Sequence, residues 1–442
     1  MTEKTRQTRP LGIWLYRFGI PILAVVTAML LGALVIWISG ADPISAYQGL
    51  FDGALFKKRA LGESLVATTP YIFLALGVGF GFRCGLFNIG VEGQYYIGQI
   101  VAVWVGYSLT GLPLLIHLPL AMVAGVLAAA FWAFIPGYLR VRFGAHEVIT
   151  TIMANYVAIY LADYLVGMKG PMRDPVASVP QTKPVFSSAQ LPRFNELPTL
   201  MENPLQRVMA ALLIGGVIFL LVRLVLTYGV KGRLRQIKVH WIIAGSVAIA
   251  ILAYWGLGHL TALGGPFTDP ASRLHVGIIL AVLTAIFMWW LLYKTTIGFE
   301  VRTVGANRHA AEYAGINVTR NFVLAMAISG ALAGMAGAVE VLGLQRTLKS
   351  FFSAGYGFDS IAIALLASND PIATLPSAFL FGALRNGADL MELRSGVSKQ
   401  VISIVQALVV MFVAAPAVIR FIYRIRKPRD EKGLVITTGW GR

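Results

Sequence analysis

Side chains that could bind a polar solute or carry a proton gather in a few glycine-containing stretches of this chain. The first stretch, residues 83–99, reads RCGLFNIGVEGQYYIGQ and holds Asn88, Glu92 and Gln94. Amide and carboxyl groups donate or accept hydrogen bonds, and a carboxyl can also exchange a proton. A carboxyl in apolar surroundings should face protein groups or a water-filled cavity, because exposing it to lipid is costly. The alternative is a short turn in water with Glu92 solvated.

A second set of polar residues lies farther along the chain. Asn155 follows Glu147 by eight residues and Asp163 follows Asn155 by eight, so the three fall near one stripe of a helix. That stripe predicts either a polar lining of a solute path or a face that packs on another helix. Asp359 lies in a further glycine-containing stretch, residues 355–371. We expect the lining of a solute path to include Asn88, Glu92, Gln94, Asn155 and Asp359.

A polar, basic segment, residues 293–321, separates two strongly apolar runs. Its centre reads GANRHAAEYAGI, where Asn307 can cap a helix at its start and Gly315 can end it. A short helix rich in Lys and Arg between two membrane spans belongs on the cytoplasmic face. It is either an ordinary capped loop or a docking element for a soluble partner. The docking interpretation concerns Gly305, Ala306, Asn307, Arg308, Ala310, Ala311, Glu312, Tyr313, Ala314 and Gly315.

The composition of the chain identifies the environment in which these residues lie. Of the 442 residues 57% are hydrophobic and 13% charged, with a mean hydropathy of +0.72. These values lie far from those of soluble globular domains. The formal net charge of +17 comes from basic residues beside apolar runs, which is a membrane-topology signal and argues against nucleic-acid binding. The chain is an integral membrane protein in contact with lipid.

Several classes of chemistry are absent from the sequence. The chain lacks the G-x-x-x-x-G-K-[ST] loop that cradles nucleotide phosphates, and it lacks the H-E-x-x-H and G-x-S-x-G motifs. The single cysteine, Cys84, excludes a disulfide framework and any multi-cysteine metal site. We therefore expect no catalytic residues, no metal and no cofactor, and a chain that moves a solute across the membrane.

The apolar runs predict an all-α, polytopic membrane protein of about 10–12 transmembrane helices, including broken or half-spanning ones. One break is expected where Asn369, Asp370 and Pro371 interrupt an apolar segment, which leaves two short helices at 361–367 and 372–384. The other predicted spans are 20–38, 65–82, 95–109, 114–135, one that follows His146, 208–226, 241–257, 276–293, 322–342 and 401–418.

The same pattern predicts how the chain is divided. A cytoplasmic tail (1–19) precedes an N-terminal transmembrane half (20–203), which ends in a proline-rich outer loop at 168–203. A helix pair at 204–269 follows, and then a C-terminal half (270–420) that contains the basic segment as a loop at 294–321. A basic cytoplasmic tail (421–442) ends the chain. Basic residues in the short flanks place both termini in the cytoplasm.

Four ordered motifs carry a resemblance to a known family. They are FNIGVEGQ at 87–94, HEVITTIMANY at 146–156, VGANRHAAEYAGI at 304–316 and GYGFDSIAIALLASNDP at 355–371. Together they resemble the permease subunits of bacterial ABC importers for nucleosides, simple sugars and branched-chain amino acids. The nucleoside permeases are the most similar, and the resemblance extends over residues 43–417. Against the pattern of that family, residues 204–269 stand out as an inserted helix pair.

The resemblance implies partners and a location. It implies a bacterial cytoplasmic membrane, a second homologous permease, an ABC ATPase subunit that docks on the basic segment as a coupling helix, and an extracytoplasmic binding protein. A small polar solute, a nucleoside at the level of the family, would be the substrate. The alternative from the residues alone is an ion-coupled secondary transporter that uses Glu92, Asp163, Glu340 and Asp359.

Overall fold

A computed structural model describes residues 10–200, 202, 204–224, 239–258, 269–350, 355–414 and 416–424. The end of the basic C-terminal tail, the first nine residues and the basic linker between the two helices of the inserted pair lie outside these ranges. The described residues form helices and isolated β-bridges, with no strand among them. The prediction of an all-α membrane protein is confirmed.

The order of helices follows the predicted spans closely. In the described ranges, five helices are long and apolar enough to cross a membrane: α3, α5, α6, α10 and α13 with its π-helical extension. The other apolar helices of the described ranges are shorter. The helices are α1 (Pro10–Ile38), α2 (Pro43–Phe51), α3 (Ala60–Arg83), α4 (Val91–Ser108), α5 (Leu114–Phe143), α6 (Glu147–Val166), α7 (Leu197–Leu200), α8 (Pro204–Leu224), α9 (Val239–Gly258), α10 (Gly277–Lys294), α11 (Thr296–Ala306), α12 (Arg308–Tyr313), α13 (Val318–Val339), α14 (Tyr356–Leu366), α15 (Thr374–Ser395), α16 (Lys399–Ala414) and α17 (Pro416–Ile422).

The core forms where α13 packs against α3, α4 and α5. Small residues permit this approach: a Cβ on Gly98 of α4 would lie 2.6 Å from the Cα of Gly334 in α13. Gly330 of α13 similarly meets Ala129 and Ala133 of α5. Close packing of small residues is the usual means of helix association in lipid, where no hydrophobic effect drives it. The core is therefore held by contact geometry along α13.

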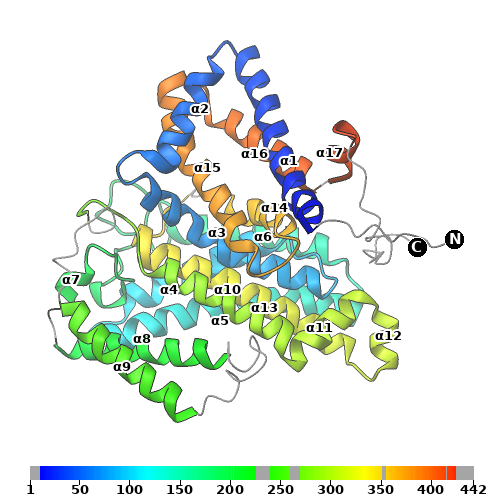
Figure 1. The fold of residues 1–442 in the computed structure, drawn as a ribbon. Coiled ribbons are helices and arrows are strands. Elements are labelled where there is room, and N and C mark those ends of the chain that lie inside the picture. Colours follow the sequence, from blue (N-terminus) through cyan, green and yellow to red (C-terminus); the bar gives the residue numbers. More distant parts are fainter. Residues whose placement is uncertain are drawn as a thin grey trace.

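A second group of helices, α1, α2, α15 and α16, stands at the top of Figure 1. Here α15 packs on α2 and α3, and α16 packs on α1. Small apolar clusters join them, one around Ile36, Leu50 and Met391 and another around Ala24 and Phe412. The helices α14 and α3 connect this group to the core. Contacts between the two helix groups are thus made mainly by α3 and α14.

The predicted break near Asn369 is present between α14 and α15. The first piece, α14, has 11 residues, but α15 has 22 and is not short. The apolar run ends at Leu384, yet the helix continues because the polar residues that follow find partners. Asn386, for example, donates hydrogen bonds to the carbonyls of Gly53 and Ala60 at 2.8 and 3.1 Å.

The predicted helix in the basic segment is α12, and its caps are those expected. The side chain of Asn307 accepts a hydrogen bond from the Ala310 N–H at 3.0 Å. Gly315 has φ +79°, the left-handed conformation that ends a helix, and the Ile316 N–H returns to the Ala311 carbonyl at 3.0 Å. A further helix, α11, precedes α12 and was not predicted. The pair lies at the opposite end of the molecule from α7 (Figure 1).

Candidate functional site

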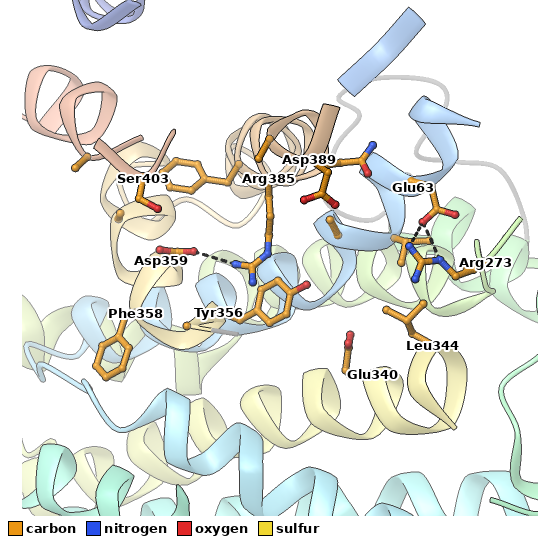
Figure 2. A pocket seen from close by; sticks show the side chains of 18 of the residues that line it. Glu63, Arg273, Glu340, Leu344, Tyr356, Phe358, Asp359, Arg385, Asp389 and Ser403 are labelled. Carbon is orange, nitrogen blue, oxygen red and sulfur yellow. Dashed lines mark hydrogen bonds and ion pairs between the residues drawn. The ribbon is translucent and has the colours of Figure 1, made fainter. Parts of the chain in front are cut away.

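A cavity of about 880 Å³ lies between the two helix groups. Its walls come from the first turns of α3, the π-helical segment Glu340–Gln345 that follows α13, the loop before α10, and the helices α14, α15 and α16. Figure 2 shows Arg385 pointing into the cavity from α15, with Asp359 and Tyr356 of α14 around it and Glu340, the first residue of the π-helical segment after α13, below. A cavity of this size can hold a drug-sized or nucleoside-sized solute.

Charged side chains of both signs stand among the apolar residues that line this cavity. Four carboxyl groups and two guanidinium groups line it: Glu63, Glu340, Asp359, Asp389, Arg273 and Arg385. At one edge Arg273 donates two hydrogen bonds to the same carboxylate oxygen of Glu63, at 2.6 and 3.0 Å. The carboxyl groups outnumber the cations, so the wall favours hydrogen-bond donors over anions as ligands.

Arg385 is the centre of one group of contacts in this wall. Its guanidinium lies 3.5 Å from the Asp359 carboxylate and donates a hydrogen bond to the Tyr71 hydroxyl at 3.0 Å. The same hydroxyl donates to Asp359 at 2.6 Å. The guanidinium also lies 4.3 Å from the centre of the Tyr356 ring, within cation–π range. Three helices, α3, α14 and α15, are thus joined at this point.

A cluster of aromatic rings packs beside Arg385 and reaches the cavity through Tyr356 and Phe381. Tyr71 packs edge-on against Tyr356, with ring centres 4.8 Å apart, and against Phe381 at 6.2 Å. Tyr95 of α4 continues the cluster at 6.1 Å from Tyr356. All four rings are at least nine-tenths buried. The cavity therefore combines charged groups with the aromatic side chains of Tyr356 and Phe381, an arrangement suited to a flat solute that carries hydroxyl or amino groups.

Of the five residues predicted to line a solute path, Asp359 lies in the cavity wall. The other four do not line the cavity and are buried against other protein groups. Asn88 donates to Gln94 at 3.0 Å and to Ser329 at 2.8 Å. Asn155 accepts from the Gly93 N–H and donates to the Ile89 carbonyl, both at 2.8 Å.

Glu92 is also fully buried, and it joins two helices. Its carboxylate accepts a hydrogen bond from the Gly357 N–H, in the first turn of α14, at 2.5 Å. A Cβ on Gly357 would lie 2.6 Å from the Cα of Glu92, so only glycine permits this approach. A carboxylate is favourable at a helix N-terminus because it meets unpaired N–H groups there. Glu92 therefore fixes the start of a helix that lines the cavity.

Sequence reasoning missed most of the cavity wall. Arg385, Arg273 and Glu63 were not singled out, and Glu340 was considered only for ion coupling. Arg385 and Asp389 are four residues apart on α15, so both can face one side of the helix. A charged pair with this spacing directly after an apolar run was the available signal.

The ten residues predicted to dock a partner differ in their exposure. Ala311 is fully buried within its own chain and cannot contact a partner in this arrangement. The remaining nine predicted residues are exposed. Tyr313 is 97% exposed, an unusual situation for an aromatic side chain. Aromatic residues with an apolar body and a polar tip are common anchors of protein interfaces. Tyr313 is therefore the strongest anchor candidate on this helix.

Comparisons with known proteins find transport permeases that are similar to this chain over nearly its whole length. The guanosine ABC transporter permease protein NupP of Bacillus subtilis is 36% identical over 408 residues, which is 91% of this chain and 94% of NupP. The nucleoside ABC transporter permease protein NupB of Lactococcus lactis is 31% identical, covering 93% of both chains. The glucose ABC transporter permease protein TsgB13 of Haloferax volcanii is 30% identical, covering 96% of this chain and 94% of its own. No solved structure matches the chain.

A family model also matches this chain to transport permeases. The model of the branched-chain amino acid transport system, permease component, matches residues 60–415, which include the cavity, the basic segment and all four motifs. The helical membrane architecture is the one that a permease requires. The chain belongs to this family of transport permeases.

Proposed function

We propose that this protein is the permease subunit of an ABC importer and that it moves nucleosides across the bacterial cytoplasmic membrane. The observation that carries the proposal is the cavity between the two helix groups, in a chain similar over nearly its whole length to nucleoside permeases. In this arrangement α12 lies on the cytoplasmic side and α7 outside, with both termini in the cytoplasm.

The cavity chemistry supports a neutral, hydroxylated, flat solute. Glu340, Asp359 and Asp389 can accept hydrogen bonds from ribose hydroxyl or exocyclic amino groups. The guanidinium of Arg385, stacked on Tyr356, offers a flat surface on which a nucleobase can lie. Asp359 keeps its proposed place in the solute path. We assign Asn88, Glu92, Gln94 and Asn155 the role of holding the helices beside the path.

The energy for transport is supplied by partners in this proposal. The exposed residues of α12, with Gly305, Ala306, Asn307, Ala314 and Gly315 at its ends, form the docking surface for an ABC ATPase subunit. A second homologous permease completes the transmembrane unit, and an extracytoplasmic binding protein delivers the solute. The chain itself hydrolyses no ATP, because its sequence has no phosphate-binding loop.

Uptake by the assembled transporter tests the substrate assignment. The complete system is expressed in cells without other nucleoside importers, and uptake of labelled guanosine is measured against excess unlabelled adenosine, glucose or leucine. The proposal expects strong competition by adenosine and little by glucose or leucine. Glucose as the effective competitor, with no guanosine uptake, would assign the cavity to sugars.

The helix pair α8 and α9 is expected to be dispensable. The two helices pack on each other, where Gly215 meets Ser246 and Ala250, and they expose Leu212 and Leu252 as a lipid-facing surface would. Figure 1 places them at the edge of the molecule. A flexible Gly-Ser linker in place of residues 204–268 should leave uptake within about threefold of the full chain, because the cavity lies elsewhere.

The deletion must keep Asp269. Its carboxylate bonds to Arg59 at 2.7 Å and pairs with Lys58 at 3.5 Å, and hydrogen bonding by Arg59 lowers the pKa of Asp269 to about 2. This carboxylate therefore stays ionised at any pH at which uptake is measured. A second deletion that also removes Asp269 serves as the comparison. It should lower uptake more than the shorter deletion does. Complete loss of uptake by the shorter deletion, in a variant that assembles, would give the helix pair a central role.

A further inference from the structure

Arg83, the last residue of α3, holds the connection between the two helices that carry the cavity. Its Nε donates to the carbonyl of Asn369 at 3.0 Å, and its Nη2 donates to the carbonyl of Ser368 at 3.1 Å. Ser368 and Asn369 lie between α14 and α15, which carry Asp359 and Arg385 respectively. One side chain therefore holds two successive peptide groups of this connection.

The connection is strained at the point that Arg83 holds. Ser368 has φ +52° and Asn369 has φ +57°, so two successive residues other than glycine adopt the left-handed conformation. Such residues are uncommon and persist only where surrounding contacts over-determine them. Tyr293 adds a contact, since its hydroxyl donates to the Asp370 carboxylate at 3.1 Å. Backbone hydrogen bonds from the N–H groups of Ser368 and Asn369 close the turn onto the end of α14. Residues at the ends of helices, such as these, are the usual positions of a hinge.

The proposed ATPase-docking segment touches the same arginine. At the end of α11, a Cβ on Gly305 would lie 2.1 Å from the Arg83 carbonyl oxygen, so the two backbones are in direct contact. Arg302 of α11 lies 5.3 Å from the centre of the Tyr293 ring, and Arg83 lies 6.0 Å from it. The segment that would dock the ATPase and the connection between α14 and α15 thus share Arg83 and Tyr293.

We propose that Arg83 is a positioning residue that transmits movement of the docking segment to the cavity. A displacement of α11 and α12 shifts the backbone of Arg83 and, through its guanidinium, the turn at Ser368 and Asn369. The turn then changes the angle between α14 and α15, and with it the separation of Asp359 and Arg385. This inference rests on the proposed function, because it assumes that a nucleotide-driven partner moves α12.

The test compares Arg83→Gln with Arg320→Gln in the complete transporter. Arg320 is exposed in the first turn of α13, so its replacement removes the same charge from the same end of the molecule. Three quantities are measured in proteoliposomes: ATPase subunit bound to the permease, ATP hydrolysed, and guanosine taken up. Arg83→Gln should leave the first two within about twofold and lower the uptake per ATP about tenfold, because the bonds to the turn are lost.

A reporter in the cavity separates transmission from simple damage. Ser403→Cys places a thiol in the cavity wall, and the native Cys84 is fully buried. In the parent chain and in Arg320→Gln, the rate of labelling at Cys-substituted Ser403 should differ between nucleotide-free and vanadate-trapped transporter. Arg83→Gln should abolish this difference while the ATPase stays bound. If Arg83→Gln does not assemble, Tyr293→Phe provides the second variant, with a smaller loss of the same difference.

The outcomes separate this inference from the proposed function. Unchanged uptake per ATP and an unchanged labelling difference in Arg83→Gln would overturn the inference, as would loss of ATPase binding, which would make Arg83 part of the docking surface. Absence of ATP-dependent uptake in the unmodified complex would instead contradict the proposed function.

Discussion

Truncating Tyr313 to alanine should detach the ATPase subunit while the permease stays folded. The side chain is 97% exposed, so its removal costs the isolated chain almost nothing. An aromatic anchor at a protein interface contributes about 2 kcal/mol or more to binding, which corresponds to about thirtyfold weaker association. Co-purification of the ATPase with Tyr313→Ala and ATP-dependent uptake should both fall to near background.

Tyr164→Ala is the matched control for this experiment. Tyr164 is 70% exposed near the end of α6, so the same truncation removes a similar exposed surface away from α12. It should leave ATPase binding unchanged. Normal binding and uptake by Tyr313→Ala would show that α12 is only a connector between α11 and α13. A large substitution at buried Ala311 would not answer the question, because it would disturb the permease itself.

Neutralising one partner of the pair Arg385 and Asp359 should lower uptake strongly, and neutralising both should restore part of it. Arg385→Gln leaves the Asp359 carboxylate with the Tyr71 hydroxyl, and Asp359→Asn leaves the guanidinium without its carboxylate at 3.5 Å. Hydrogen bonds to charged groups contribute about 1.5–3 kcal/mol, so each single variant should lose roughly tenfold or more in uptake rate. The double variant should lose less than the sum of the two.

The same helix provides the control. Arg394 of α15 forms an ion pair with Asp52 at 2.7 Å, and both side chains are exposed to nearly the same extent as those of Arg385 and Asp359. Arg394 does not line the cavity. Arg394→Gln should therefore change uptake little, as for most surface ion pairs. Additive losses for Arg385 and Asp359, or equal losses for Arg394→Gln, would contradict a specific role of the cavity pair.

Local signals in the sequence were sufficient to predict some elements of the fold. The cap at Asn307 and the left-handed Gly315 depend on neighbouring residues only, and both are observed. The interruption at Asn369 to Pro371 is likewise a local property of the backbone. The orientation of α12 is not local, because it depends on packing against the rest of the chain. For that reason the burial of Ala311 could not be anticipated.

The cavity could be predicted only in part, because it is built by long-range contacts. Arg385 meets Tyr71, which is 314 positions away in the chain. Asn88, Glu92 and Asn155 were recognised as polar residues in apolar stretches, and the structure buries all three. Whether such a residue binds a solute or another helix depends on which partner folding brings to it. The sequence alone does not show which of the two partners is used, because either a solute or another helix can satisfy a polar group in the membrane.

The most direct measurement of the central claim is solute uptake in proteoliposomes that contain this permease, its partner permease and the ATPase, with the binding protein supplied outside. Guanosine uptake should require ATP inside the vesicles and the binding protein outside, and it should continue when proton and sodium gradients are collapsed. Uptake driven by an ion gradient without ATP would contradict the account and make the buried carboxyls, Glu92 and Glu340 among them, the coupling groups of a secondary transporter.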